Sequence, residues 1–151
     1  MQQIILHTHQ INSGTNIQVL NVFAQNLPFS MTDQFFSAGL HPWHIGKVDP
    51  DNCLLAIEKA TVHENLLAIG ECGLDRSVEE AFAVQELYFK RQIEIAEKYH
   101  KPLIIHCVRA YPDLIIGPSL DYSWLQWKSG DYKKSEQARF LFFSRRIVPD
   151  R

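Results

Sequence analysis

Short apolar runs, each closed by polar or turn-forming residues, divide the first three quarters of the chain. Runs rich in Val, Ile, Leu and Phe predict five strands, at Gln3–His9, Asn16–Ala24, Phe35–Leu40, Leu66–Glu71 and Leu103–Cys107. A turn is expected at Gly73, directly after the fourth of these strands.

Two longer segments carry helical signals. Asp49 followed by Pro50 is typical of a helix start and predicts a helix that continues to Glu64. Within Val78–His100 apolar residues recur at spacings of three and four and form one apolar face, at Phe82, Phe89, Ile93 and Ala96. Strands that alternate with helices favour the α/β class, with βαβ units on a parallel sheet.

Polar side chains stand near the ends of several predicted strands, where α/β folds place their chemistry. His7 and His9 close the first strand, Glu71 closes the fourth, and His106 lies near the end of the fifth. Because the strands are expected to be parallel, these four side chains should meet at one edge of the sheet.

Composition narrows the class of protein only slightly. A hydrophobic fraction of 46%, a charged fraction of 21% and 151 residues suit one globular domain. No apolar run is long enough to span a bilayer, and the N-terminus lacks the features of a signal peptide. Three cysteines without CxxC spacing fit a reducing compartment, so we expect a cytoplasmic protein without a membrane partner. A net charge of −2 does not by itself indicate a nucleic-acid binder.

The histidines at 7 and 9 and the glutamate at 71 each have two readings. Residues two apart on a strand share a face, so the imidazoles of His7 and His9 can reach one cation, although two solvent-facing side chains are an equal alternative. Glu71 ends an apolar strand, and burying an unpaired carboxylate is unfavourable. A cation beside it is favoured over an Arg or Lys partner at the sheet edge.

The third motif is His106 in Ile104–Arg109. Alone, this histidine is better explained as a core residue that donates to a backbone carbonyl. Together with the other two motifs it favours a shared site for divalent metal, with His7, His9, Glu71 and His106 as ligands.

Five motifs, taken in order, resemble those of the TatD family of metal-dependent deoxyribonucleases. They cover roughly residues 1–114, and they are His-x-His at 7–9, Gly-x-His-Pro at 39–42, Ala-Ile-Gly-Glu-Cys-Gly-Leu-Asp at 68–75, Gln-x3-Phe-x2-Gln at 85–92 and Ile-His-x-x-Arg-Ala at 105–110. Each motif alone is weak, but the ordered set is specific.

The resemblance implies an amidohydrolase-like (β/α) barrel with a two-metal site, and therefore a partial TIM-type barrel here. His7 and His9 match the pair that binds the first metal, Glu71 matches the catalytic carboxylate that bridges both, and His106 matches a ligand of the second. Mg, Mn or Zn is the implied cofactor and DNA the implied substrate. Such a site polarises a phosphodiester, activates water and stabilises the leaving oxygen.

Two further residues are expected to contact substrate. Arg109 follows His106 closely enough to bind a phosphate through its guanidinium, with a salt bridge to Asp or Glu as the equal alternative. His41 precedes Pro42, which argues for a turn, so we expect it in a loop at the mouth of the site.

The sequence departs from the family pattern after about residue 114. The family has a further metal-binding histidine and an aspartate on later strands, yet no histidine follows His106. A complete barrel needs at least ~200 residues. We therefore expect a TatD-like half barrel at 1–114 and a divergent tail at 115–151, helical or poorly ordered, in which 140–143 could form a strand. A truncated or frame-disrupted copy of a barrel is one hypothesis.

A half barrel has consequences for assembly and for activity. Unpaired sheet edges predict a homo-oligomer or aggregation. Missing ligands predict weak or no catalysis, so a non-catalytic remnant or interaction module is one alternative function. A second alternative is an amidohydrolase-like enzyme for a small amide, ester or phosphoester, which the low net charge favours and the motif at 68–75 disfavours.

Overall fold

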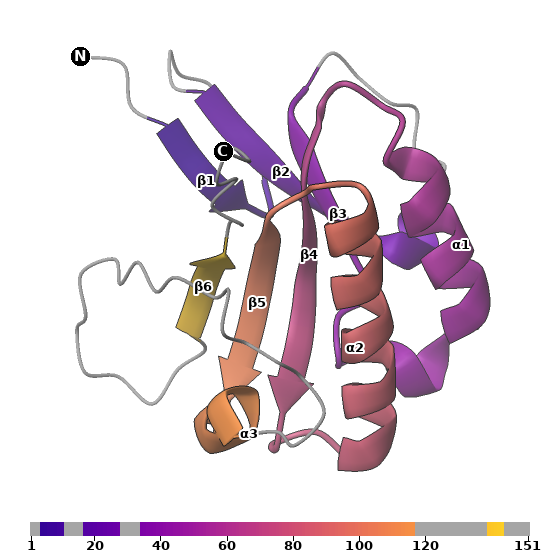
Figure 1. Cartoon of the computed structure of the whole chain (residues 1–151), viewed down its shortest axis with the longest axis vertical. Coiled ribbons are helices and arrows are strands. Elements are labelled where there is room, and N and C mark those ends of the chain that lie inside the picture. Colours follow the sequence, from indigo (N-terminus) through magenta and orange to yellow (C-terminus); the bar gives the residue numbers. More distant parts are fainter. Residues whose placement is uncertain (1–3, 11–16, 28–33, 117–138, 144–151) are drawn as a thin grey trace, which may run out of the picture.

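One curved sheet organises the computed structural model, which describes residues 4–10, 17–27, 34–116 and 139–143 (Figure 1). Its strands lie side by side in the order of the chain: β1 (Ile4–Thr8), β2 (Ile17–Phe23), β3 (Phe36–Gly39), β4 (Leu66–Asp75), β5 (Leu103–Val108) and β6 (Arg139–Phe143). The first five strands are parallel and form a curled half barrel with helices. The predicted α/β fold with a partial TIM-type barrel is confirmed.

Two helices cover one face of the sheet. α1 (Pro50–Ala60) connects β3 to β4, and α2 (Phe82–Lys98) connects β4 to β5, so each forms the crossover between parallel neighbours (Figure 1). The short elements are η1 (Ala24–Asn26), η2 (Ile45–Lys47) and α3 (Tyr111–Ile116). Apolar side chains from helices and strands fill the space between the layers, including Leu40, Ile57, Leu66, Ile69, Phe89 and Ile93.

The start of α1 follows from its sequence, but its end differs from the prediction. The side chain of Asp49 accepts a hydrogen bond from the Asn52 N–H at 3.0 Å and caps the helix. The helix ends at Ala60 rather than at Glu64, because the hydroxyl of Thr61 bonds to the carbonyl of Glu58 and the chain then turns into β4.

The predicted turn at Gly73 is wrong, because β4 continues through this residue to Asp75. Gly73 and Gly70 adopt φ values of +146° and +132°, which favour glycine. A Cβ at Gly73 would collide with the carbonyl oxygen of His106, so this glycine allows close contact between β4 and β5. The extended strand therefore carries Glu71 and Asp75 to the same end of the sheet.

The expectation of unpaired parallel edges fails at β5, whose far edge is covered, and holds at β1, which pairs only with β2 among the described strands. β6 pairs with β5 in antiparallel register, with Leu103 opposite Phe143 and Cys107 opposite Arg139. The candidate strand at 140–143 is thus confirmed, while residues 117–138 and 144–151 of the predicted tail lie outside the described residues. The domain boundary near residue 114 and the predicted homo-oligomer stay predictions. Among the described helices, none is long and apolar enough to cross a membrane.

Candidate metal centre

Glu71 is the central side chain of the site, and neighbouring strands fix its backbone. It lies on β4 with only 2% of its surface exposed. Its N–H donates to the side-chain carbonyl of Asn21 on β2 at 2.9 Å, and the hydroxyl of Ser37 on β3 donates to the same oxygen at 3.3 Å. Three adjacent strands therefore hold this carboxylate at a defined position.

Two buried imidazoles, His41 and His106, face one oxygen of Glu71, and we call them the inner pair. His106 on β5 places Nδ1 2.9 Å from Oε1, and His41, just after β3, places Nε2 3.5 Å from the same atom. The two rings lie with their centroids 4.3 Å apart. His41 and His106 are 3% and 2% exposed, so this part of the site is shielded from solvent.

Two imidazoles from β1 and the residue that follows it, His7 and His9, face the other oxygen of Glu71, and we call them the outer pair. Their Nε2 atoms lie 3.5 and 3.8 Å from Oε2 and 3.2 Å from each other. The side chain of His7 is 11% exposed, whereas that of His9 is 52% exposed. Three donor atoms thus converge at the solvent-facing side of the carboxylate.

Asp75 is a second buried carboxylate, and it orients His106 of the inner pair. Its Oδ2 accepts hydrogen bonds from Nε2 of His106 at 2.9 Å and from the indole N–H of Trp43 at 2.7 Å. Its Oδ1 accepts from the backbone and hydroxyl of Ser77. An ionised carboxylate can only accept, so Nε2 of His106 carries a proton and Nδ1 is directed at Glu71.

The charges of these groups follow from their surroundings. Burial would raise the pKa of Glu71, but hydrogen bonds from His106 and His41 outweigh it and lower that pKa to about 2. Burial lowers the pKa of His7 and His41, which keeps both imidazoles neutral at pH 7. Ionised carboxylates and neutral imidazoles bind divalent cations, so Glu71, His7 and His41 have suitable charges. The pKa of His106 is raised by Glu71 and Asp75, so this imidazole must lose a proton before it binds an ion.

Two buried glutamines of α2 hold the strand ends that carry site residues. Gln92 accepts from the N–H of Leu40 at 2.8 Å and donates to the carbonyl of the same residue at 3.1 Å, directly before His41. Gln85 does the same for the backbone of Asp75, at 2.8 and 3.1 Å. Each glutamine therefore positions one functional segment through its backbone.

Geometry divides the site into two sets of metal-binding groups. His7, His9 and Glu71 form one set, and His41, Glu71 and His106 form the other. Within each set the ligand atoms all lie within 4.8 Å of one another, so the three groups of a set could bind one ion together.

Comparison with known proteins identifies the family of the chain. The family described as TatD related DNase matches residues 4–116. This chain belongs to the TatD family. The match ends within a few residues of the point at which the sequence motifs fade.

The TatD relatives are modestly similar and considerably longer. The 3'-5' ssDNA/RNA exonuclease TatD of Pantoea ananatis is 32% identical over 107 residues, which span 69% of this chain and 40% of the relative. The TatD exonuclease of Musicola paradisiaca is 37% identical over 76 residues, 50% of this chain and 28% of the relative. The human 3'-5' RNA nuclease TATDN2 is 35% identical over 79 residues, 51% and 10% of the two chains.

A solved structure of the same family shares the fold. The TatD homologue YjjV of Escherichia coli superposes with a TM-score of 0.59 at 24% identity, over 66% of this chain and 42% of YjjV. The chain therefore spans well under half the length of these relatives.

The predicted site residues fall into three groups, according to where the structure places them. The convergence of His7, His9 and His106 on Glu71 is confirmed as geometry, while their role as ligands stays a prediction. His41 does lie in a loop, but it is buried against Glu71 rather than exposed at the mouth.

Arg109, the predicted phosphate contact, remains exposed at the end of β5 with a φ of +52°. No described carboxylate pairs with it, so the salt-bridge alternative has no support in the described part of the chain. Its contact with phosphate stays a prediction.

Two positioning residues escaped the sequence interpretation. Asp75 was missed because the sequence predicted a turn at Gly73. In the structure β4 continues to Asp75, so positions 71, 73 and 75 lie on one face of the strand. Asn21 lies in the middle of β2 and carries no motif that could have marked it.

Proposed function

We propose that this TatD-family chain hydrolyses phosphodiester bonds of DNA with divalent metal held at Glu71. One observation carries the proposal: a single buried carboxylate has two imidazoles directed at each of its two oxygens. A carboxylate in that position is suited to bridge two cations. The family description and the nuclease names of the relatives support nucleic acid as the substrate.

The donor set fits a metal ion chemically. The Nε2 atoms of His7 and His9 lie 3.2 Å apart and both face Oε2 of Glu71, so two imidazole nitrogens and one carboxylate oxygen surround one position. Imidazole nitrogen suits zinc better than magnesium, and carboxylate oxygen suits magnesium and manganese as well. The outer pair with Glu71 would hold one ion, and the inner pair with Glu71 the other.

The number of donors favours catalysis over a purely structural role. Each set offers three protein ligands, as in catalytic zinc sites, whereas structural zinc sites use four. When bound, such an ion polarises a phosphoryl oxygen and makes water a better nucleophile. Asp75 would keep Nδ1 of His106 directed at the site, and Arg109 would bind a phosphate of the substrate.

A non-catalytic interaction module is the second candidate. The sequence observation that favours it is the absence of any histidine after His106, where the family pattern has a further ligand. Such a module would bind metal or nucleic acid without turnover, so the two candidates differ in one measurable property.

Cleavage of a labelled single-stranded oligodeoxynucleotide by the full chain, with Mn²⁺, Zn²⁺ or Mg²⁺, tests the proposal. Glu71→Gln keeps the size of the side chain but removes its charge, and should reduce cleavage by about a thousandfold or more. Glu94→Gln, at an exposed carboxylate on α2, is the matched control and should cleave like the parent.

Three outcomes separate the candidates. Metal-stimulated cleavage that Glu71→Gln abolishes supports the nuclease. Metal binding by calorimetry without any cleavage favours the interaction module. Cleavage that survives in Glu71→Gln would contradict a role for this carboxylate.

A further inference from the structure

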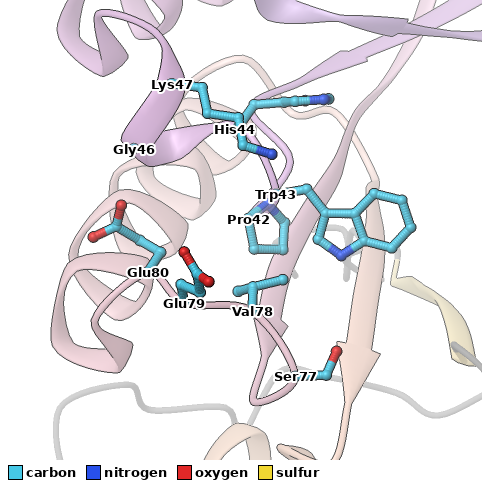
Figure 2. Close-up of a pocket in the computed structure, with 9 residues that line it drawn as sticks. All are labelled: Pro42, Trp43, His44, Gly46, Lys47, Ser77, Val78, Glu79 and Glu80. Carbon is cyan, nitrogen blue, oxygen red and sulfur yellow. The ribbon is translucent and has the colours of Figure 1, made fainter.

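A hollow of about 760 Å³ lies beside the metal centre (Figure 2). It is lined by residues 42–44 and 46–47 around η2 and by residues 77–80 after β4. We call it the Trp43 hollow. Its volume is within the range of ~300–1,000 Å³ that is usual for small-molecule sites. None of the roles assigned above uses this space.

Trp43 is the most unusual residue of this lining. Leu40 and His41, which precede Pro42 in the chain, are 0% and 3% exposed, whereas Trp43 is 51% exposed. Single exposed apolar side chains are common, so the exposure of Trp43 has meaning only because the indole also borders the hollow and bonds to a residue of the metal centre. The burial of its neighbours shows that the segment as a whole is not simply peripheral.

The exposed indole is nevertheless held in one orientation. Its Nε1–H donates to Oδ2 of Asp75 at 2.7 Å, and its backbone N–H donates to Nδ1 of His41 at 3.2 Å. The rings of Trp43 and His41 meet edge to face, with centroids 4.8 Å apart and an interplanar angle of 69°. An aromatic surface fixed in advance loses little conformational entropy when a planar ligand stacks on it.

The same contacts connect the indole to the metal centre. The oxygen of Asp75 that accepts a hydrogen bond from Trp43 also accepts one from His106. The centroids of the Trp43 and His106 rings lie 5.8 Å apart. A nucleotide whose phosphate reaches Glu71 would therefore have its base close to Trp43.

The charges of the hollow favour a base over a phosphate. Glu79 is exposed and has no partner among the described residues, and Glu80 lines the same wall. In Figure 2 these two carboxylates lie on one side of Pro42 and the indole on the other. Lys47 also lines the hollow, but two carboxylates against one ammonium leave the lining net negative. The lining therefore repels a phosphate that the metal centre attracts, and a nucleotide would direct its uncharged base into the hollow.

We propose that Trp43 is a base-stacking residue, and that the Trp43 hollow receives the nucleobase next to the phosphodiester that is cleaved. The inference rests on the proposed function, because it names the part of a single-stranded nucleic acid that this site holds. Stacking on an aromatic face accepts every base, so little sequence preference is expected.

Two variants and one altered substrate test this role. Steady-state cleavage is compared for a natural oligodeoxynucleotide and for one with abasic nucleotides at the cleaved end. Loss of one stacked base should lower kcat/KM of the parent about tenfold, mainly through KM. Trp43→Ala should show the same loss on the natural substrate and no additional loss on the abasic one.

Controls separate stacking from folding. Trp43→Phe keeps an aromatic face and should stay within about threefold of the parent, because base stacking tolerates a smaller ring. Leu87→Ala removes a side chain of similar exposure, 53%, from α2 and should leave both substrates unaffected. Binding of the labelled oligonucleotide without metal, followed by fluorescence anisotropy, gives a readout that is independent of cleavage.

Each contrary outcome has a definite meaning. A parent enzyme that cleaves natural and abasic substrates equally well has no base site, whatever the variants do, and the inference is overturned. Equal losses on both substrates in Trp43→Ala would assign Trp43 a structural role and also overturn it. A parent that neither binds nor cleaves nucleic acid removes the proposed function, and the base site with it.

Discussion

The two pairs of imidazoles around Glu71 are alike in composition but differ in how they are held. The inner pair is buried, and Asp75 and Gln92 fix His106 and the segment of His41. The outer pair stands at the end of β1, the first strand of the sheet, and half of the His9 side chain is exposed. Ligands that are already in position lose less entropy on binding. The inner pair should therefore bind its ion more tightly than the outer pair binds its own.

The largest expected effect follows from removal of one imidazole from each pair. His106→Ala should weaken the tighter metal-binding step by more than about a hundredfold, since one of three protein ligands is lost. His9→Ala should weaken the other step by about tenfold, because its half-exposed side chain loses more entropy when it binds an ion. Isothermal titration calorimetry with Mn²⁺ or Zn²⁺ measures both steps.

His100→Asn provides the control for this comparison. His100 is exposed at the end of α2 with a φ of +53°, a conformation that asparagine tolerates. The His100→Asn variant should bind metal with the same affinities as the parent. Equal losses in His106→Ala and His9→Ala would show that burial and orientation do not distinguish the pairs.

A smaller effect is expected from Asp75→Asn. The amide keeps the shape of the side chain but not its charge, so His106 loses the carboxylate that orients it. Metal affinity at the inner pair should fall about 10–100-fold, as is usual when the partner of a ligating histidine is removed. Asp113→Asn breaks an ion pair with Arg76 away from the centre and should change affinity little. A loss confined to the outer pair would contradict the assignment of Asp75.

The smallest effect concerns pH. Burial lowers the pKa of His106, but Glu71 and Asp75 outweigh it and raise that pKa above 6.5, whereas burial lowers the pKa of His7. An ion at the inner pair must displace a proton from His106, so its affinity should increase by up to about tenfold per pH unit between about pH 6 and 7. The lowered pKa of His7 means that less proton has to be displaced there, so the outer pair should respond less.

His9→Ala, which retains the inner pair, and His106→Ala, which retains the outer pair, give the two pH dependences separately. Calorimetry in buffers of different ionisation enthalpy counts the protons that are released. Equal slopes in the two variants would contradict the pKa difference between His106 and His7.

The order of the elements could be predicted because each signal was local. Apolar runs of strand length, the Asp49–Pro50 start of α1 and the apolar face of α2 all recur in the structure. The boundaries could not be predicted where tertiary contacts decide them. Gly73 shows this, since its role is a close approach to the carbonyl of His106 and not a turn.

The candidate site could be predicted only as far as strand ends reveal it. His7, His9, Glu71 and His106 close apolar strands and were found in this way. His41 was placed in a loop correctly, yet the sequence gives no sign that curvature of the sheet brings it within 3.5 Å of Glu71. Asp75 and Trp43 act through hydrogen bonds between segments 32 positions apart, which no local pattern encodes.

The antiparallel pairing of β6 has a consequence for any closure of the barrel. β6 engages the backbone groups of β5 from Leu103 to Cys107, the row that a further parallel strand would need as its template. One row of amides and carbonyls accommodates a single neighbour. A further parallel strand can therefore pair with β5 only after β6 is displaced, whereas a strand that adds without this displacement must pair with the outer edge of β6.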